Sequence, residues 1–315
     1  MSHHIIYRPK VAILQICSLF AICLFLVTPI TNCWSKDSNP RRLKVLIVDG
    51  FSNHNWQQTT RAVRQILEAT NLFDIDVSTA PSSPEAPEWD MWRPQFFDYD
   101  VVIQNTNNIG KSRLRWPGVV EVALENYVRS GGGLYVLHSA NNAFSHWQQY
   151  DRMIGLGWRS KDGGTALEVS EDGRIIRIPP GEGSGTSHGP RLDTVVRILN
   201  NHPINEGFPK YWKTPSLEVY VYARGPCENL KVLSYAYDKT TQKYWPIEWV
   251  VQYGKGRVYN STFGHLWRDE VEPAGVRCVG FQTTLVRATQ WLAAKKVTWP
   301  VPSNFPTENT ISLRE

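Results

Sequence analysis

Short apolar segments recur along the first half of the chain at the spacing expected of a buried sheet. VLIV at 45–48 and LYVL at 134–137 contain no polar residue, which is typical of strands covered on both faces. FDIDVST at 73–79 alternates between apolar and polar residues, as a strand with one buried face does. YDVVIQN at 99–105 has a short apolar centre. These patterns predict four strands.

Helical patterns separate the predicted strands. Apolar residues three and four positions apart predict helices over 60–70 and 118–130, and Gly131 marks the end of the second helix. The order strand, helix, strand, strand, helix, strand is typical of an α/β domain. We therefore expect a mostly parallel central sheet with right-handed crossovers and helices on both faces.

The second half of the chain has a less regular pattern. Residues 155–190 are rich in Gly, Ser, Thr and Pro, so loops are expected there, interrupted by a short strand at 174–178. A strand beginning at residue 193 is expected to end before a turn at His202. The remaining predicted elements are strands over 217–223 and 231–237, a hairpin over 246–265 that turns at Gly254–Gly256, and a closing helix over 281–296.

The N-terminal segment is distinct from the folded part. Residues 11–30 are apolar enough for a secretory signal or a membrane anchor, so residues 1–33 are predicted to be one or the other. The protein is accordingly expected to be exported to the periplasm or the cell exterior, with membrane attachment if the segment is not cleaved. A polar linker over 34–42, a folded domain over 43–297 and a C-terminal tail over 298–315 complete the predicted organisation.

Composition narrows the function classes. The 315 residues carry a net charge of only +5, spread without a long basic block, which argues against a nucleic-acid partner. The 13 Trp, 13 Tyr and 11 Phe are consistent with a pocket for ligands with flat apolar faces, such as sugars, although most aromatic rings fill cores. Beyond the N-terminal segment only Cys227 and Cys278 remain, so at most one disulfide can form and the fold must rely on its core.

Polar residues gather where three of the predicted strands end. In parallel sheets ligands bind just beyond the carboxyl ends of the strands, because the loops there converge. His265 ends the predicted hairpin and belongs to the same edge. The other candidates are His54, Asn55, Trp56, Asn105, His138, Ser139, Asn141 and Asn142.

The chain resembles the ThuA-like (trehalose utilisation) family, a branch of the class I glutamine amidotransferase-like superfamily. The resemblance rests on the order of KVLIVDGFSNHNW, YDVVI, YVRSGGGLYVLHSA, NHPI, LEVY and PIEWVVQYGKGRVYNSTFGH, followed by the closing helix. It extends from residue 43 to about 297. The resemblance implies a flavodoxin-like, three-layer α/β sandwich and a role in carbohydrate metabolism, without specifying a reaction.

The chain departs from the wider superfamily at the nucleophile. Glutamine amidotransferases carry a cysteine at a sharp strand-to-helix turn, paired with a histidine from a later strand, whereas this chain has His138-Ser139 at that turn. Glutamine hydrolysis through a thioester is therefore not expected. His265 stands where the partner histidine would be, so a hydrolase using Ser139 and His265 is one alternative, although no G-x-S-x-G surrounds Ser139. The candidate catalytic residues are His138, Ser139 and His265.

Histidines at one edge also suggest a metal. His54, His138 and His265 could ligate zinc or a similar divalent ion, since neutral imidazoles that converge are zinc ligands, although no H-E-x-x-H or C-x-x-C motif supports such a site. Without a metal, the same imidazoles could act as general acid and base. The candidate substrate-binding residues are His54, Asn55, Trp56, Asn105, Asn141, Asn142, Trp147, His188, Glu218 and Glu248.

Two functions remain open from the sequence. The favoured one is an enzyme that acts on a sugar or keto-sugar by histidine acid–base chemistry, with or without a metal. The other is a non-catalytic carbohydrate-binding or accessory protein. Several histidines beside an aromatic-rich pocket favour the enzyme, because binding alone has little need of them. Glu248 could orient a histidine or pair with Arg257 across the predicted hairpin.

Overall fold

The structure is a computed structural model that describes residues 41–315. The predicted signal or anchor and most of the linker lie outside the described residues. Arg42–Glu315 form one packed unit, into which the segment after residue 297 is also packed. For example, the ring of Phe305 contacts the ring of Trp212, with centroids 5.4 Å apart. Within residues 41–315 we find no helix with the length and apolar character needed to cross a bilayer.

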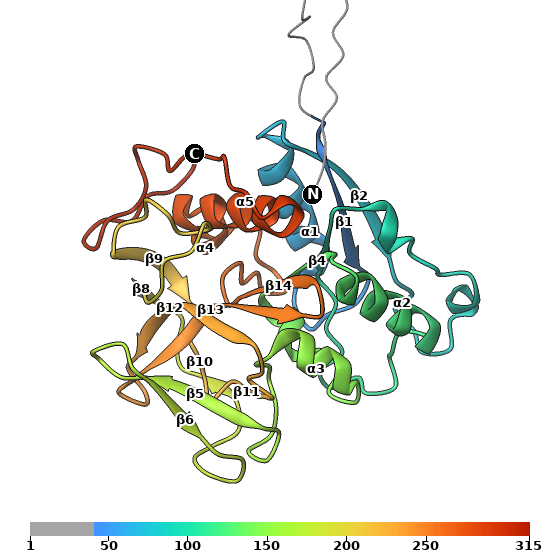
Figure 1. Ribbon diagram of the computed structural model, residues 1–315, viewed down its shortest axis with the longest axis horizontal. Coiled ribbons are helices and arrows are strands. Elements are labelled where there is room, and N and C mark those ends of the chain that lie inside the picture. The colour runs from blue at the N-terminus through green and yellow to red at the C-terminus, as the bar shows by residue number, and fades with distance from the viewer. Residues whose placement is uncertain (1–40) are drawn as a thin grey trace, which may run out of the picture. The chain divides into compact units, whose positions relative to one another are not determined.

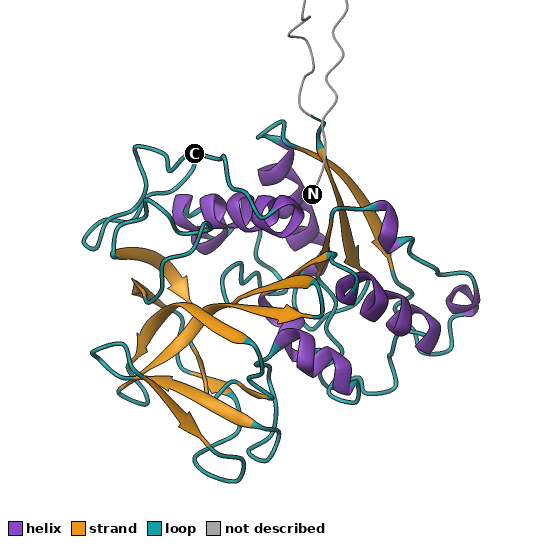
Figure 2. Cartoon of the chain, viewed as in Figure 1, coloured by secondary structure: helices purple, strands orange, loops and turns teal. Residues whose placement is uncertain are grey.

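Helices and strands follow one another in the order that the first half of the sequence predicts (Figures 1 and 2). The helices are α1 (Trp56–Glu68), α2 (Gly118–Arg129), α3 (Gln148–Ile154), α4 (Ala274–Arg277) and α5 (Val279–Ala294), with short 3₁₀ turns η1 (Pro87–Asp90), η2 (Phe96–Asp98) and η3 (His138–Asn142). The strands up to the middle of the chain are β1 (Leu43–Asp49), β2 (Phe73–Thr79), β3 (Val101–Gln104), β4 (Gly133–Leu137), β5 (Thr165–Val169), β6 (Ile175–Ile178) and β7 (Ser187–His188). The later strands are β8 (Leu192–Ile198), β9 (Tyr211–Leu217), β10 (Tyr220–Val221), β11 (Arg224–Gly225), β12 (Leu230–Asp238), β13 (Lys243–Tyr253) and β14 (Gly256–Ser261).

The central sheet is mixed, which corrects the expectation of a mostly parallel one. Its path runs β2-β1-β3-β4-β14-β13-β12-β8-β9, and β5, β6 and β11 join at the side of β13 to make twelve strands within the described part of the chain. Only β2, β1, β3, β4 and β14 are parallel to one another; from β14 onward each neighbour on the path is antiparallel. The absence of helices between β5 and β14 is the reason, because parallel neighbours need long crossovers and consecutive strands joined by tight turns pair antiparallel. The fold is therefore mixed α/β, and a flavodoxin-like sandwich describes at most its parallel half.

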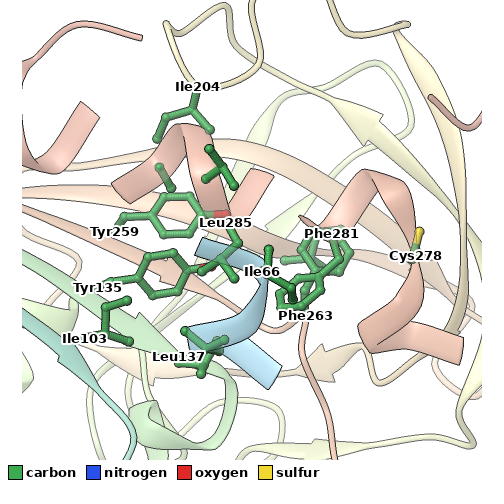
Figure 3. Close-up of a cluster of buried hydrophobic side chains, with 14 of the residues drawn as sticks. Ile66, Ile103, Tyr135, Leu137, Ile204, Tyr259, Phe263, Cys278, Phe281 and Leu285 are labelled. Atoms are coloured by element: carbon green, nitrogen blue, oxygen red, sulfur yellow. The ribbon is translucent and has the colours of Figure 1, made fainter. Parts of the chain in front are cut away.

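Two apolar cores lie on the two faces of the parallel half. Helices α1 and α5 cover one face, where Tyr135 and Tyr259 of neighbouring strands lie beside Leu285 of α5 (Figure 3). In the same core Phe281 of α5 packs against Phe263, with ring centroids 6.5 Å apart. Helices α2 and α3 contribute to the core on the other face (Figure 1). Residues of β4 alternate between the two cores and all are buried, as the unbroken LYVL run predicts.

The glycines at the start of β4 are required by backbone conformation at Gly131 and by a close contact at Gly133. Gly131 has φ +127°, a backbone conformation that disfavours other residues, and it follows the end of α2. A Cβ on Gly133 would lie 2.7 Å from the carbonyl oxygen of Leu292, where α5 crosses the strand. The glycine run thus lets the chain leave α2 and enter the sheet directly under α5.

One predicted strand is wrong. Residues 217–223 were expected to form a continuous strand, but β9 ends at Leu217 and only the short β10 follows. Ser216 and Tyr222 have φ values of +50° and +52°, which break the extended backbone on both sides. The break turns Glu218 out of the sheet direction and toward the carboxyl edge of the parallel strands.

The two cysteines of the folded domain form no disulfide, and His202 lies in a turn. Cys227 and Cys278 are both free and buried, so the possible disulfide does not form. His202 lies in a turn, where the backbone N–H of Ile204 donates to its Nδ1 atom at 3.3 Å. This confirms the structural role expected of the NHP segment.

Candidate functional site

Three imidazoles meet at the carboxyl edge of the parallel strands. His54 follows β1, His138 follows β4 directly, and His265 follows β14. Their ring centroids lie 5.0–5.1 Å apart and their planes are steeply inclined to one another. Glu218 completes the group, and one ligand atom from each of the four residues lies within 4.8 Å of the others. We call His54, His138, His265 and Glu218 the His3Glu cluster.

His138 is held in a strained turn with one ring nitrogen fixed. Its φ is +44°, an uncommon conformation for a residue other than glycine and one that often marks functional positions. Its Nδ1 donates to the backbone carbonyl of Thr262 at 2.7 Å. The lone pair is therefore on Nε2, which lies 3.5 Å from Oε2 of Glu218.

His54 is oriented in the same way by a side chain. Its Nδ1 lies 2.8 Å from Oδ1 of Asn53, and that oxygen also accepts a 2.6 Å hydrogen bond from Nδ2 of Asn107. Because Asn107 donates, the Asn53 atom is an acceptor and the proton of His54 is on Nδ1. Nε2 of His54 is left with its lone pair, as metal-binding histidines require.

His265 has a different set of partners. Nη1 of Arg191 lies 2.8 Å from its Nδ1, and Arg191 also pairs with Glu270 at 2.8 Å. Since a guanidinium only donates, Nδ1 accepts and the proton of His265 is on Nε2, 3.6 Å from Oε1 of Glu218. Ligation through Nε2 requires this proton to move to Nδ1, where Oε2 of Glu270 lies 3.6 Å away as its acceptor.

Glu218 is buried against imidazoles. Its side chain is 7% exposed, and its Oε1 also lies 3.3 Å from Nε2 of His188. Burial raises the pKa of Glu218 above its ordinary value, while His188 and Arg191 oppose the shift. A carboxylate in this position is stabilised by any additional positive charge placed among the four side chains.

The imidazoles are held neutral. Burial, followed by the charge of His265, lowers the pKa of His54 to about 3, and burial, followed by Arg191, lowers the pKa of His265 to about 4. Burial also lowers the pKa of His138 well below its ordinary value, with further lowering by His265 and His54. Neutral imidazole is the form that binds metals, so the cluster is in a ligating state at neutral pH.

The spacing of the cluster suits a metal ion. Nitrogen and oxygen ligands lie about 2.0–2.2 Å from zinc, so atoms bound to one ion are no more than about 4 Å apart. The four candidate atoms, within 4.8 Å of one another, need to move inward by less than about 1 Å. Three imidazole nitrogens and a carboxylate oxygen suit zinc, and similar first-row ions as well.

Comparison with known proteins gives evidence on the family that does not depend on the geometry of the cluster. Residues 44–292 match the model of the ThuA family, described as trehalose utilisation. The chain belongs to the ThuA family. A ThuA-like protein from Parabacteroides merdae has a crystal structure that matches 87% of this chain and 98% of its own with a TM-score of 0.80, at 32% sequence identity. In all, 32 solved chains match the protein, and no curated protein does.

Ser139 is close in sequence to the cluster but does not pair with His265. Its side chain is buried, and within residues 41–315 it makes no hydrogen bond to His265. The strained residue of the turn is His138 and not Ser139. The ThuA-family fold thus gives the serine–histidine pair no geometric support, and the pair stays a prediction.

Several of the predicted substrate-binding residues hold loops together. Asn55 caps α1 by accepting from the backbone N–H of Gln58 at 3.2 Å, and it donates to the carbonyl of Arg268 at 2.9 Å. Asn105 donates to the carbonyl of Trp56, the first residue of α1, at 3.1 Å. These bonds fix the loop that carries His54 relative to β3 and to the loop after His265.

Two other predicted positions, Trp147 and Glu248, lie in the interior. Trp147 packs in the core on the α2 and α3 side, where its indole N–H donates to Glu125, so it does not line the cluster. Glu248 accepts from Ser234 and Tyr259 inside the sheet, so it neither orients a histidine of the cluster nor pairs with Arg257. Both positions were predicted from residue type, and their burial in the interior, away from the cluster, explains the difference.

Asn141 and Asn142 are buried in η3, directly after His138. The side-chain amide of Asn141 has no hydrogen-bond partner in the described part of the chain, nor does the amide oxygen of Asn142. Within residues 41–315 neither asparagine side chain hydrogen-bonds to a residue of the cluster. The structure thus places them next to His138 in the chain and gives them no established role.

The rim of the cluster was only partly predicted from the sequence. Arg191, Trp267 and Glu270 surround His265, and Glu218 was predicted as a substrate-binding residue and not as a ligand. The signal for Trp267 and Glu270 was HLWRDE, which begins at His265 itself. His188, predicted as substrate-binding, does lie at the rim, 40% exposed and beside Glu218.

Proposed function

We propose that the protein is an enzyme of carbohydrate metabolism whose reaction takes place at a divalent metal ion bound by His54, His138, His265 and Glu218. The observation that carries the proposal is the convergence of these four side chains on one point while Nδ1 of His54 and of His138 is fixed by an oxygen acceptor. A fixed Nδ1–H is the usual second contact of a metal-binding histidine.

The chemistry would suit a sugar or a keto-sugar. A bound cation polarises carbonyl and hydroxyl oxygens and makes a neighbouring proton easier to remove. His188 lies beside the cluster and is exposed, so an imidazole is available next to an oxygen bound there. The family's description as trehalose utilisation supports a carbohydrate as substrate. The apolar residues 11–30 support export as the setting of this reaction.

Metal analysis of the full chain, purified without a histidine tag, tests the proposal. We expect about one zinc or manganese ion per chain, lost in His54→Ala, His138→Ala and Glu218→Ala. His146→Ala is the matched control, because His146 pairs with Glu121 at 3.1 Å outside the cluster and its loss should leave the metal content unchanged. A variant with His3 and His4 replaced by alanine excludes binding by the N-terminal histidines.

Turnover completes the test. Metal-loaded protein should convert at least one member of a panel of sugars and keto-sugars, and the chelated protein should not. Stoichiometric metal with no turnover of any member would favour the non-catalytic carbohydrate-binding alternative. A full chain that takes up no metal after incubation with zinc and manganese would overturn the proposed centre.

A further inference from the structure

The cluster leaves no room for a sugar between its own side chains. One ligand atom from each of the four residues lies within 4.8 Å of the others, which leaves space for an ion but not for a sugar ring. His138 and His265 are 3% and 8% exposed. A sugar ring that reaches an ion in the cluster must therefore lie outside, on the exposed rim.

Trp267 is the apolar member of that rim. It is 38% exposed, whereas most large apolar side chains of the sheet are buried. Its ring lies nearly parallel to that of His265, with centroids 6.0 Å apart and an angle of 15°, and it contacts the ring of His54 edge-on at 5.0 Å. The indole is thus in contact with two of the four cluster residues.

The backbone around Trp267 is fixed by bonds to neighbouring loops. Its N–H donates to Oε2 of Glu270 at 2.7 Å, and Glu270 is in turn paired with Arg191. The N–H of Asn55 donates to the carbonyl of Leu266 at 3.1 Å, which joins this loop to the one that carries His54. A held aromatic ring binds a ligand with little loss of side-chain entropy.

Polar donors accompany the exposed ring. Within residues 41–315 the indole Nε1–H of Trp267 makes no hydrogen bond, and the residue as a whole is exposed. The guanidinium of Arg268 lies over the Trp267 ring, 5.1 Å from its centre, so it covers part of one face of the ring. Its single hydrogen bond in the described part of the chain is a 3.4 Å contact with the carbonyl of Asn53. An apolar face with free N–H donors beside it matches a sugar ring, which has apolar C–H faces and a hydroxyl perimeter.

We infer that Trp267 is the platform on which the ring of the carbohydrate substrate lies, with Arg268 donating to its hydroxyl groups, so that an oxygen of that ring reaches the ion in the cluster. The inference rests on the proposed function and adds the subsite that recognises the substrate. At the rim His188, Arg191 and Glu270 are polar, and Trp158, whose ring centroid lies 5.8 Å from that of His188, is half-buried, so the apolar contact is assigned to the exposed Trp267.

The experiment compares Trp267→Ala, Trp267→Phe and Phe97→Ala in the metal-loaded full chain. Phe97 is 65% exposed and packs edge-on against Tyr127, away from the cluster, so it is a matched control for the loss of a surface aromatic ring. Metal content and the dissociation constants of glucose, trehalose and their keto derivatives are measured for each protein by calorimetry.

We expect Trp267→Ala to bind sugar roughly three- to tenfold more weakly, with unchanged metal content. Trp267→Phe should retain most of the affinity, and Phe97→Ala all of it. Equal sugar affinity in Trp267→Ala and the wild type, or no affinity of the metal-loaded wild type for any of these sugars, overturns the inference while leaving the metal centre intact. Loss of metal in Trp267→Phe as well would also overturn it, by making the ring a structural cover of the cluster. Failure of the proposed function is distinct, because the wild type itself then binds no metal.

Discussion

Nε2 of His138 lies 3.5 Å from Oε2 of Glu218, although β14, β13, β12 and β8 separate their strands in the sheet. His138 follows the central strand β4, and Glu218 follows the terminal strand β9. The segment after β9 must therefore return across the carboxyl edge of the sheet to bring the carboxylate to the imidazoles. The parallel strands position the three histidines of the cluster, and the antiparallel half of the fold contributes its carboxylate, Glu218.

Removing the partner of a ligand should weaken metal binding without removing a ligand. In Asn53→Ala, Nδ1 of His54 loses its 2.8 Å acceptor, so the ring is no longer held with its proton on Nδ1 and the lone pair on Nε2. We expect the zinc dissociation constant to rise roughly 10- to 100-fold, measured by competition with a chelating indicator. The exposed Asn201→Ala is the control and should bind zinc as the wild type does. Equal affinities in both variants would contradict the role of Asn53.

Alanine substitutions at Gly133 and Gly118 should change the free energy of unfolding differently. A Cβ at Gly133 meets the backbone of Leu292 at 2.7 Å, whereas nothing lies within 4 Å of one at Gly118 in the first turn of α2. Gly133→Ala should therefore lower the free energy of unfolding by about 1–3 kcal/mol. Gly118→Ala should leave it unchanged or raise it by up to about 1 kcal/mol. Urea unfolding measures both changes. An unchanged free energy of unfolding in Gly133→Ala would contradict the close contact between β4 and α5.

Glu248 should make the fold less stable as the pH rises. Burial raises its pKa above the ordinary 4.5, with Ser234 and Tyr259 opposing the shift. The folded state thus favours the protonated acid, so its contribution to stability is present below pH 4.5 and is lost as the pH rises through the raised pKa. Glu248→Gln should accordingly gain stability relative to the wild type as the pH increases from about 4.5. Urea unfolding across pH tests this, with the exposed Glu228→Gln as control; parallel curves for Glu248→Gln and the wild type would refute it.

The contribution of His202 to stability should have the opposite pH dependence to that of Glu248. Burial, followed by the charge of Lys231, lowers its pKa from 6.5 to about 4, and its Nδ1 accepts from the N–H of Ile204. Because the folded state favours the neutral ring, its contribution is present above pH 6.5 and is lost as the pH falls toward 4. Asparagine offers an acceptor at the same place and takes up no proton. The acid branch of the stability curve should be shallower in His202→Asn, and an unchanged slope would argue against this role.

The predictable part of the fold is the part whose signal is local. β2 is found at 73–79, as predicted, and β4 begins one residue before the predicted run. Both were predictable because an unbroken apolar run, or a regular alternation of apolar and polar residues, specifies which side chains are buried. β9 was not predicted, since YWKTPSL contains a proline and no clear alternation. Whether the later strands pair parallel or antiparallel depends on contacts between distant segments, which the pattern within a segment does not contain.

The same limit applies to the site. His54, His138 and His265 could be placed together because each follows a strand, and parallel strands end at one edge. Glu218 as a ligand could not, because it arrives through the break at Ser216 and Tyr222 in what looked like a continuous strand. Trp267 and Glu270 depend on the loop after β14, whose course is set by bonds to the loop of Asn55.

The most direct test of the metal centre is the position of the ion in a crystal. Anomalous diffraction from crystals of the zinc-loaded protein, measured at the zinc edge, should give one strong peak about 2.0–2.2 Å from Nε2 of His54, His138 and His265 and from a carboxylate oxygen of Glu218. Nδ1 of His265 should then face Glu270 and no longer accept from Arg191. No peak among these four side chains, with Arg191 still bonded to His265, would contradict the account.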